Sequence, residues 1–210
     1  LGPMAEGDPG GLSAARIEAC LDGSLRRLRT DRVDLYMPHA PDSRVPLEHT
    51  LEALGRAVRA GKIRAWGLSN FPVAAVRAAR RAGVPGGPAF VQAEFSMVAR
   101  GGEDDWSRLW EETGIPVLAW SPLAGGLLSG KYLRPDVQGR LRGSRPFPPY
   151  EPARFEALAR MLETKSRRAG VPAARAALAW VLARPWIASA VCGATSASQW
   201  RELCGLAIHT

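Results

Sequence analysis

Short apolar segments alternate with helical patterns along most of the chain, and this alternation restricts the folds that it can adopt. The five apolar segments that predict strands cover 33–37, 62–68, 89–94, 115–119 and 187–192. Between them, apolar residues recur at helical spacing. Strands separated by helices pair in parallel through right-handed crossovers, so we expect an α/β fold on a parallel sheet of about five strands.

The predicted helices have recognisable start and stop residues. Ser13 can cap the first helix, and Pro46 can begin the second, which ends at Gly61. The expected helices cover about 13–28, 46–60, 72–82, 104–113, 152–169 and 172–183, with a last one from about 198. The polar, Pro- and Arg-rich segment 133–149 is too long for an ordinary connection, so we interpret it as a flexible or ligand-covering loop.

Polar or aromatic side chains fall at the end of every predicted strand. In a (β/α)8 barrel such positions meet on one rim, where the ligands of that fold bind. An open doubly wound sheet is the alternative architecture, and it too binds ligands at the carboxyl edge of the sheet. The side chains in question belong to His39, Ser69, Asn70, Gln92, Trp120, Ser121 and Thr195.

The segment 115–132, IPVLAWSPLAGGLLSGKY, predicts a buried strand that runs into an anion-binding loop. Ser121 offers a hydroxyl group just after the strand. Gly125 and Gly126 let backbone N–H groups approach an anion closely, and Lys131 can add a positive charge.

Residues 125–131 also approximate the nucleotide-binding P-loop, G-x-x-x-x-G-K. Tyr132 replaces the Ser or Thr that would hold Mg²⁺, and Pro135 interrupts the helix that should follow. A Rossmann site is also disfavoured, because no G-x-G-x-x-G follows a predicted strand. We therefore expect neither ATP or GTP hydrolysis nor a Rossmann dehydrogenase.

Composition places the chain among soluble globular proteins. Its 210 residues, 46% hydrophobic and 23% charged, suit one domain over residues 1–210. No apolar run has the length of a membrane span, and the first residues lack the features of a signal peptide. The three cysteines show no metal-ligand spacing, so we expect no metal site and a reducing, cytoplasmic location.

The net charge of +8 comes almost entirely from arginine and has two interpretations. The simpler one is a set of solvated helix faces. The sharper one is attraction to an anionic ligand, such as a phosphorylated cofactor or a nucleic acid. The sequence contains neither zinc-finger spacing nor an aromatic RNA-binding signature, which argues against a nucleic-acid partner.

Five stretches together carry a family resemblance. They are DLYMPHAPD, KIRAWGLSNF, FVQAEFS, VLAWSPLAGGLLSGKY and CGATSASQWREL. In this order and spacing they resemble the aldo-keto reductase superfamily, in particular aflatoxin-aldehyde-reductase-type enzymes and potassium-channel β-subunit-like members. The resemblance extends over nearly the whole chain. It implies a (β/α)8 barrel that uses NADPH to reduce the carbonyl of a small aldehyde or ketone to an alcohol.

The resemblance also implies roles for residues near the nicotinamide. His39 matches the family histidine that helps to orient the substrate carbonyl. Ser69, Asn70 and Gln92 match the groups that hold the carboxamide, and amide side chains suit this task because they both donate and accept. Trp120 matches the aromatic residue that stacks on the nicotinamide ring, for which a flat indole face is well suited.

The remaining implied roles concern the phosphates and the adenosine. Thr195 and Gln199 would lie near the start of the last helix, where backbone N–H groups favour phosphate. In the long loop, Arg140 is the candidate for a basic residue that clamps the cofactor. The residues that match the pyrophosphate loop are Ser121, Pro122, Leu123, Gly125 and Lys131, and those around the adenosine and its 2′-phosphate are Thr195, Gln199 and Glu202.

Each of these residues has a structural interpretation as well. Ser69 and Asn70 could cap the helix that follows them. Gln92 could satisfy a buried backbone group, and Trp120 could fill the mouth of the barrel. Taken singly, a histidine at a strand end is more often structural than catalytic, and it is the five motifs together that favour a chemical role for His39.

The sequence departs from the family pattern at its beginning. The Asp, Tyr and Lys of the family site lie on its first three strand–helix units, which this sequence lacks. Tyr36, Tyr132 and Tyr150 are poor substitutes, because Tyr36 is three residues from His39 on one strand and so points to the opposite face. We therefore expect a reductase whose catalytic set is incomplete, either an incomplete record or a natural truncation.

Five strands cannot close an eight-stranded barrel, so the edge strands should lack partners. Such a chain is expected to aggregate, to pair with a second copy or to form part of a longer protein. The alternative function is a non-catalytic NADPH-binding or interaction protein that keeps the cofactor rim without the proton donor.

Overall fold

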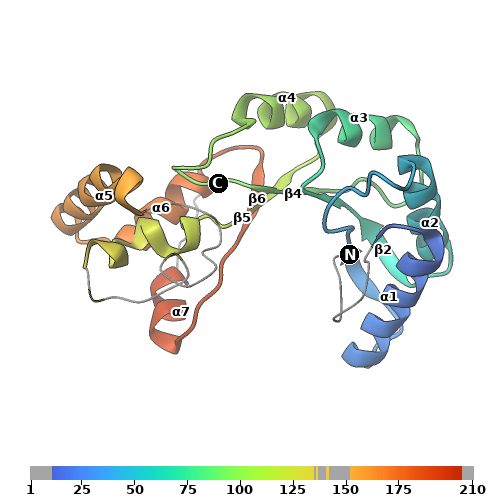
Figure 1. Ribbon diagram of the computed structural model, residues 1–210, viewed down its shortest axis with the longest axis horizontal. Coiled ribbons are helices and arrows are strands. Elements are labelled where there is room, and N and C mark those ends of the chain that lie inside the picture. Colours follow the sequence, from blue (N-terminus) through green and yellow to red (C-terminus); the bar gives the residue numbers. More distant parts are fainter. Residues whose placement is uncertain (1–10, 135, 137–140, 142–151, 205–210) are drawn as a thin grey trace. The chain divides into compact units, whose positions relative to one another are not determined.

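A computed structural model describes residues 11–134, 136, 141 and 152–204 (Figure 1). Helices and strands alternate over these residues as the sequence predicts. Arg140 and most of the predicted loop 133–149 lie outside the described residues. No helix among the described residues has both the length and the apolar character needed to cross a membrane.

The chain divides into two compact units. The first comprises Leu1–Ala93 and Arg108–Val117, and the second comprises Glu94–Ser107 and Leu118–Thr210. The division passes through strands β4 and β5 and through helix α4, which supply residues to both units. The single domain expected over residues 1–210 stays a prediction.

The first unit carries two layers, helices and parallel strands. Strand β1 pairs in parallel with β2, and β3 pairs in parallel with β4. Helix α1 packs against α2, and α2 packs against β2 and α3. The elements are α1 (Ala14–Leu28), β1 (Val33–Tyr36), α2 (Leu47–Arg59), β2 (Ile63–Trp66), β3 (Leu68–Ser69), α3 (Val73–Arg81) and β4 (Val91–Glu94).

Helix α1 forms where its cap and apolar spacing predict it. The Ser13 hydroxyl accepts a hydrogen bond from the backbone N–H of Arg16, which satisfies one of the free donors of the first turn. Ile17 and Leu21 are fully buried, as their spacing indicates. Leu28 differs, because its side chain is 63% exposed at the carboxyl end of the helix.

The predicted strand 62–68 is interrupted at Gly67 and forms β2 and β3. A Cβ atom on Gly67 would lie 2.5 Å from the carbonyl oxygen of Phe90, so only glycine allows the chains to approach this closely. The backbone N–H of Gly67 donates to Tyr36 O at 3.1 Å, and that of Ser69 donates to Pro38 O at 3.1 Å. The backbone at Gly67 and Ser69 is therefore hydrogen-bonded to the end of β1 and to the segment that follows it.

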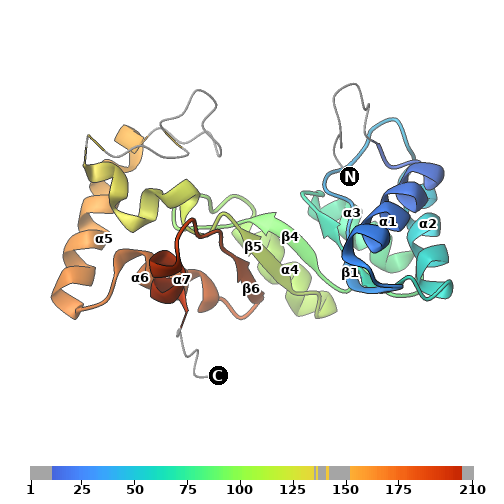
Figure 2. The same cartoon turned by 90° about the horizontal axis from the view of Figure 1, so that it is seen from below.

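The second unit is built around short helices and the strand pair β5 and β6. Helix α6 packs against α5, α7, β6 and η1 (Figure 2). The described strands form two sheets, one of β1 and β2 and one with the order β3-β4-β5-β6. The elements are β5 (Val117–Trp120), η1 (Ala124–Ser129), η2 (Lys131–Leu133), η3 (Pro152–Phe155), α5 (Glu156–Ala169), α6 (Ala173–Leu182), β6 (Ile187–Val191) and α7 (Ala197–Leu203), with α4 (Glu103–Thr113) shared between the units.

Two clusters form the core of the second unit. One is aromatic: Phe95 stacks on Trp180 at 5.6 Å between ring centroids and meets Trp186 edge-on at 4.7 Å. The other is mainly aliphatic and holds η1 and η2 against α5 and α6. Its buried members are Ala124, Leu127, Leu128, Tyr132, Leu141, Leu162, Ala173 and Ala177.

Candidate functional site

Four predicted site residues come together at adjacent strand ends in the first unit. Asn70 Nδ2 donates to the carbonyl oxygen of His39 at 2.9 Å and to Ser69 Oγ at 3.1 Å. Gln92 Nε2 reaches the same Ser69 Oγ at a long 3.5 Å. The ends of β1, β3 and β4 are thus joined by side chains, as the strand-end pattern predicts.

The local backbone explains why these side chains meet. Ser69 and Gln92 are register partners in the parallel pair β3 and β4. Asn70 has φ +59°, in the left-handed region that asparagine tolerates better than most residues. The structural interpretation of Ser69 and Asn70 as a helix cap is wrong, because α3 has Pro72 at its N-cap and no side-chain cap bond.

Tyr36 and His39 face different surroundings. His39 is exposed at the end of the strand. The Tyr36 hydroxyl is buried, and among the described residues it has no hydrogen-bond partner. Burial, followed by the nearby Cys20 of α1, raises the pKa of Tyr36 to about 12. β1 ends at Tyr36, so His39 lies beyond the strand and the expected alternation of faces does not reach it. A buried phenol with this pKa does not suit proton transfer.

In the second unit, the loop after Trp120 coils more tightly than the sequence suggests. Ser121 and Ala124 have φ +54° and +50°, and the two glycines that follow are also left-handed. The N–H of Ala124 donates to Ser121 O at 2.8 Å, and that of Gly126 donates to Leu123 O at 2.9 Å. The segment is thus a 3₁₀ coil that uses part of its own N–H groups, rather than an open loop.

Lys131 and Tyr132 close this coil. Lys131 Nζ lies 4.8 Å from the centroid of the Tyr132 ring, in a cation–π contact. The lysine side chain also covers Gly126, where an added Cβ would lie 2.6 Å from Lys131 Cε. Pro122 is buried, and Leu123 packs on the aliphatic cluster. Of the predicted pyrophosphate residues, these two therefore have a packing role.

Of the residues predicted to surround the adenosine, Thr195 and Gln199 lie at the start of α7 and Glu202 lies near its end. Gln199 Oε1 accepts from Thr195 N at 2.9 Å and from Thr195 Oγ1 at 3.0 Å. Ser196 caps the helix by accepting from the backbone N–H of Gln199. Glu202 is held through its backbone, since Arg175 Nε donates to its carbonyl oxygen at 2.9 Å.

Comparison with known proteins decides the family. The model of the aldo/keto reductase family matches residues 3–208.

The chain belongs to the aldo/keto reductase family.

Among curated proteins, an aldo-keto reductase of Babesia bovis is 36% identical over 244 residues, covering 91% of this chain and 79% of the relative. The uncharacterized oxidoreductase YrpG of Bacillus subtilis is 34% identical, covering 93% of this chain and 60% of that protein. A probable voltage-gated potassium channel subunit beta of Arabidopsis thaliana is 32% identical, covering 93% of this chain and 64% of that protein. The chain thus spans under two thirds of two of these three relatives.

Solved structures give the same assignment. The glycerol dehydrogenase AKR11B4 of Gluconobacter oxydans superposes with a TM-score of 0.79 at 29% identity, over 93% of this chain and 60% of that one. The thermostable aldo-keto reductase Tm1743, solved with the inhibitor epalrestat, gives 0.73 at 28% identity, over 91% of this chain and 60% of that one. The fold is therefore that of a (β/α)8 barrel, of which this chain forms part.

Sequence reasoning missed one polar clamp in this aldo/keto reductase chain. The carboxylate of Asp42 accepts from Leu12 N at 3.1 Å, from Arg44 N at 3.0 Å and from Arg44 Nε at 2.9 Å. The hydrogen bonds from Arg44 lower the pKa of Asp42 to about 2. Asp42 thereby ties the loop after His39 to the segment before α1. The turn-forming sequence Pro-Asp-Ser-Arg was the available signal.

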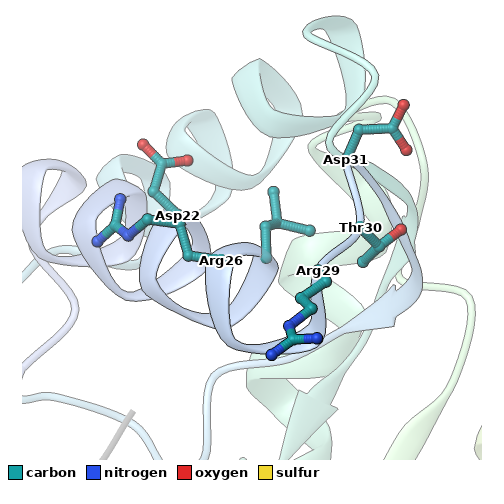
Figure 3. A pocket seen from close by; sticks show the side chains of 6 residues that line it. Asp22, Arg26, Arg29, Thr30 and Asp31 are labelled. Carbon is teal, nitrogen blue, oxygen red and sulfur yellow. The ribbon is translucent and has the colours of Figure 1, made fainter.

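The first unit also has a hollow beside the carboxyl half of α1, and Figure 3 shows the side chains that line it. It is formed by the last two turns of α1 and by the residues between α1 and the amino end of β1. Functional groups of (β/α)8 barrels gather at the opposite, carboxyl end of the strands. Its lining residues are Asp22, Leu25, Arg26, Arg29, Thr30 and Asp31.

The described residues contain no group of three or more His, Cys, Asp or Glu side chains that could hold a metal ion. Cys20, Cys192 and Cys204 are free thiols. Burial raises the pKa of the Cys192 thiol, which lowers its thiolate fraction.

Proposed function

We propose that this chain binds NADPH across the carboxyl ends of its strands and belongs to an oxidoreductase that reduces a small aldehyde or ketone to the alcohol. The observation that supports this most is the bonded set of His39, Ser69, Asn70 and Gln92 at three adjacent strand ends. Membership of the aldo/keto reductase family supports the oxidoreductase class.

The hydrogen bonding around Ser69 fits a carboxamide. Its hydroxyl is fully buried and accepts from both Asn70 and Gln92. A hydroxyl has two acceptor positions and one proton, so its proton remains for an acceptor such as the carboxamide oxygen. Gln92 is only half-buried, so of the Ser69 and Gln92 side chains it is the one with open access to a ligand on this rim.

The other cofactor contacts are proposed from the second unit. Trp120 is half-buried at the end of β5, and its indole face suits stacking on the nicotinamide ring. Lys131 supplies a positive charge beside the coil that follows. We assign the pyrophosphate to Ser121, Pro122, Leu123, Gly125 and Lys131, and the adenosine with its 2′-phosphate to Thr195, Gln199 and Glu202. Arg140 remains the candidate for a basic residue that clamps the cofactor.

When bound, NADPH supplies the hydride for the carbonyl carbon. His39 can donate an N–H to the substrate carbonyl oxygen and so orient it. No tyrosine among the described residues suits proton donation beside it. Tyr36 is buried against α1, and the Tyr132 hydroxyl already bonds Gly125 O and Leu141 N. We therefore propose that this chain alone binds cofactor but turns over little substrate.

The test combines binding and turnover. Quenching of Trp fluorescence on NADPH titration should saturate, and Ser69→Ala should weaken binding roughly tenfold, about 1.4 kcal/mol for one lost hydrogen bond. Ser24→Ala on α1 is the matched control and should bind like the wild type. Binding that is absent, or that is equal in both variants, would refute the proposed site.

Turnover is measured with 4-nitrobenzaldehyde and NADPH on the same 22.6 kDa chain. A rate above the uncatalysed background would contradict the proposed lack of a proton donor, while supporting the reductase assignment. A parallel titration with NADH compares the affinities for the two cofactors. A contact to the 2′-phosphate would make NADPH bind more tightly.

A second candidate function is a non-catalytic NADPH-binding or interaction protein. The relative from Arabidopsis thaliana named as a probable channel subunit favours this candidate. The hydroxyl of Tyr132, which is already hydrogen-bonded, and the partly exposed strands β1 and β6 favour it as well. Leu35 on β1 and Val191 on β6 are 51% and 49% exposed, which suits association of two copies. Saturable NADPH binding without turnover in any assembly state would favour this candidate.

The free thiols Cys20, Cys192 and Cys204 fit a reducing compartment, and we propose a cytoplasmic location. Fractionation of cells that express the tagged protein would test it. We propose neither a nucleic-acid nor a membrane partner.

A further inference from the structure

Asn70 touches three strand ends at once. Its backbone N–H donates to the carbonyl oxygen of Gln92 in β4 at 2.9 Å. Its side-chain Nδ2 donates to His39 O at 2.9 Å, beyond β1, and to the neighbouring Ser69 Oγ at 3.1 Å. An amide nitrogen carries two protons, and these two bonds use both of them.

The hydrogen bonds around His39 fix the direction in which its side chain leaves the backbone. Ser69 N donates to Pro38 O at 3.1 Å, which holds the peptide unit before the His39 Cα. Asn70 Nδ2 holds the peptide unit after it. Because the two peptide planes that flank a Cα set its φ and ψ, they also set the direction of its Cβ. The imidazole is exposed, so its position depends on this backbone more than on packing around the ring.

The backbone at Asn70 does not by itself explain why asparagine stands there. At φ +59° glycine would adopt the same conformation at lower cost. Asparagine is tolerated in this region, and it differs from glycine by the amide that reaches His39. The side chain therefore accounts for the residue type, through its bonds to His39 and Ser69.

We propose that Asn70 is a positioning residue, whose side-chain amide fixes the direction of the His39 imidazole and couples it to whatever carboxamide occupies the Ser69 and Gln92 strand ends. The coupling follows from the proton count. Because both protons of Asn70 Nδ2 are used, a carboxamide oxygen that approaches this nitrogen must share or displace its bond to His39 O or its bond to Ser69 Oγ. This inference rests on the proposed function for the identity of the ligand, but the tie to His39 is independent of it.

The test uses NMR of the histidine rings in the full chain. His39 and His49 are recorded in the wild type, Asn70→Gly, Asn70→Asp and Gln92→Ala. Both Asn70 variants keep a residue that tolerates the left-handed backbone while removing the N–H donors. We expect them to displace the His39 ring resonances several times further than those of His49 on α2, and Gln92→Ala to displace them much less.

Addition of NADP⁺ supplies a second readout. In the wild type it should move the His39 resonances, and in Asn70→Gly the movement should be smaller. His39 resonances that stay in place in both Asn70 variants, or that move no further than those of His49, overturn the positioning role. If NADP⁺ leaves the wild-type spectrum unchanged, the proposed cofactor site fails, while the variants without ligand still decide the role of Asn70.

Discussion

The hydroxyl of Tyr132 accepts a hydrogen bond from the backbone N–H of Leu141 at 3.0 Å. It also reaches the carbonyl oxygen of Gly125 at 3.3 Å, so one phenol ties the coil after β5 to a buried point in the long loop. Tyr132 is 6% exposed and Leu141 is 5% exposed. The bond therefore lies inside the aliphatic cluster, where an unpaired N–H is costly.

Tyr132→Phe should lower the free energy of unfolding by about 1–3 kcal/mol, because it leaves the buried N–H of Leu141 without its acceptor. Urea denaturation followed by circular dichroism measures this change. An unchanged midpoint would contradict the view that this hydroxyl holds the loop.

Tyr36→Phe is the matched substitution in the first unit and should have the opposite outcome. The Tyr36 hydroxyl is buried and has no partner among the described residues, so its removal leaves no other group unsatisfied. We expect stability equal to or slightly above that of the wild type in the same urea assay. A loss as large as that for Tyr132→Phe would show that the Tyr36 hydroxyl has a partner.

The Asp42 clamp predicts a pH dependence. Its pKa is lowered to about 2 in the folded chain, while an unfolded aspartate titrates at about 3.9. The depressed pKa stabilises the folded chain fully above about pH 4, and this stabilisation is lost as the pH falls through about 2. Urea midpoints of the wild type and Asp42→Asn should therefore differ at pH 6 and converge near pH 2. A constant difference would contradict the assignment.

Gly67→Ala tests the close approach that interrupts the strand. The new Cβ would lie 2.5 Å from Phe90 O, a backbone atom that cannot turn aside. We expect a loss of about 1–3 kcal/mol from overpacking, measured by thermal or urea unfolding. Gly101→Ala is the control, because nothing lies within 4 Å of its added Cβ and its φ is not positive. That variant should be neutral or slightly more stable.

The sequence predicted the order of the elements because each strand and helix carries its own local pattern. Helix α1 illustrates this, with its Ser13 cap and its buried Ile17 and Leu21. The break at Gly67 was not predictable, since its cause is the carbonyl of Phe90, a contact between strands. The tight coil after Trp120 was missed as well, because glycines permit several backbone conformations and do not select one.

The candidate site also has features that the sequence predicted and features that it did not. Strand ends predicted that His39, Ser69, Asn70 and Gln92 would meet, because parallel strands place their carboxyl ends at one edge. The spacing did not indicate that Asn70 would bond the backbone of His39, which depends on the left-handed turn. The turn around Asp42 was readable from the sequence, but its bond to Leu12, which comes from a distant part of the chain, was not.

Lys131 has little freedom left in the folded chain, since its side chain lies over Gly126 and against the Tyr132 ring. A long cationic side chain normally loses rotamer entropy when it grips an anion. At the proposed pyrophosphate site these contacts order the side chain before a ligand arrives, so that a phosphate would meet a charge already in place. Replacement of the Tyr132 ring would then leave the association rate of the anion unchanged. It would raise the dissociation rate and so shorten the lifetime of the bound anion.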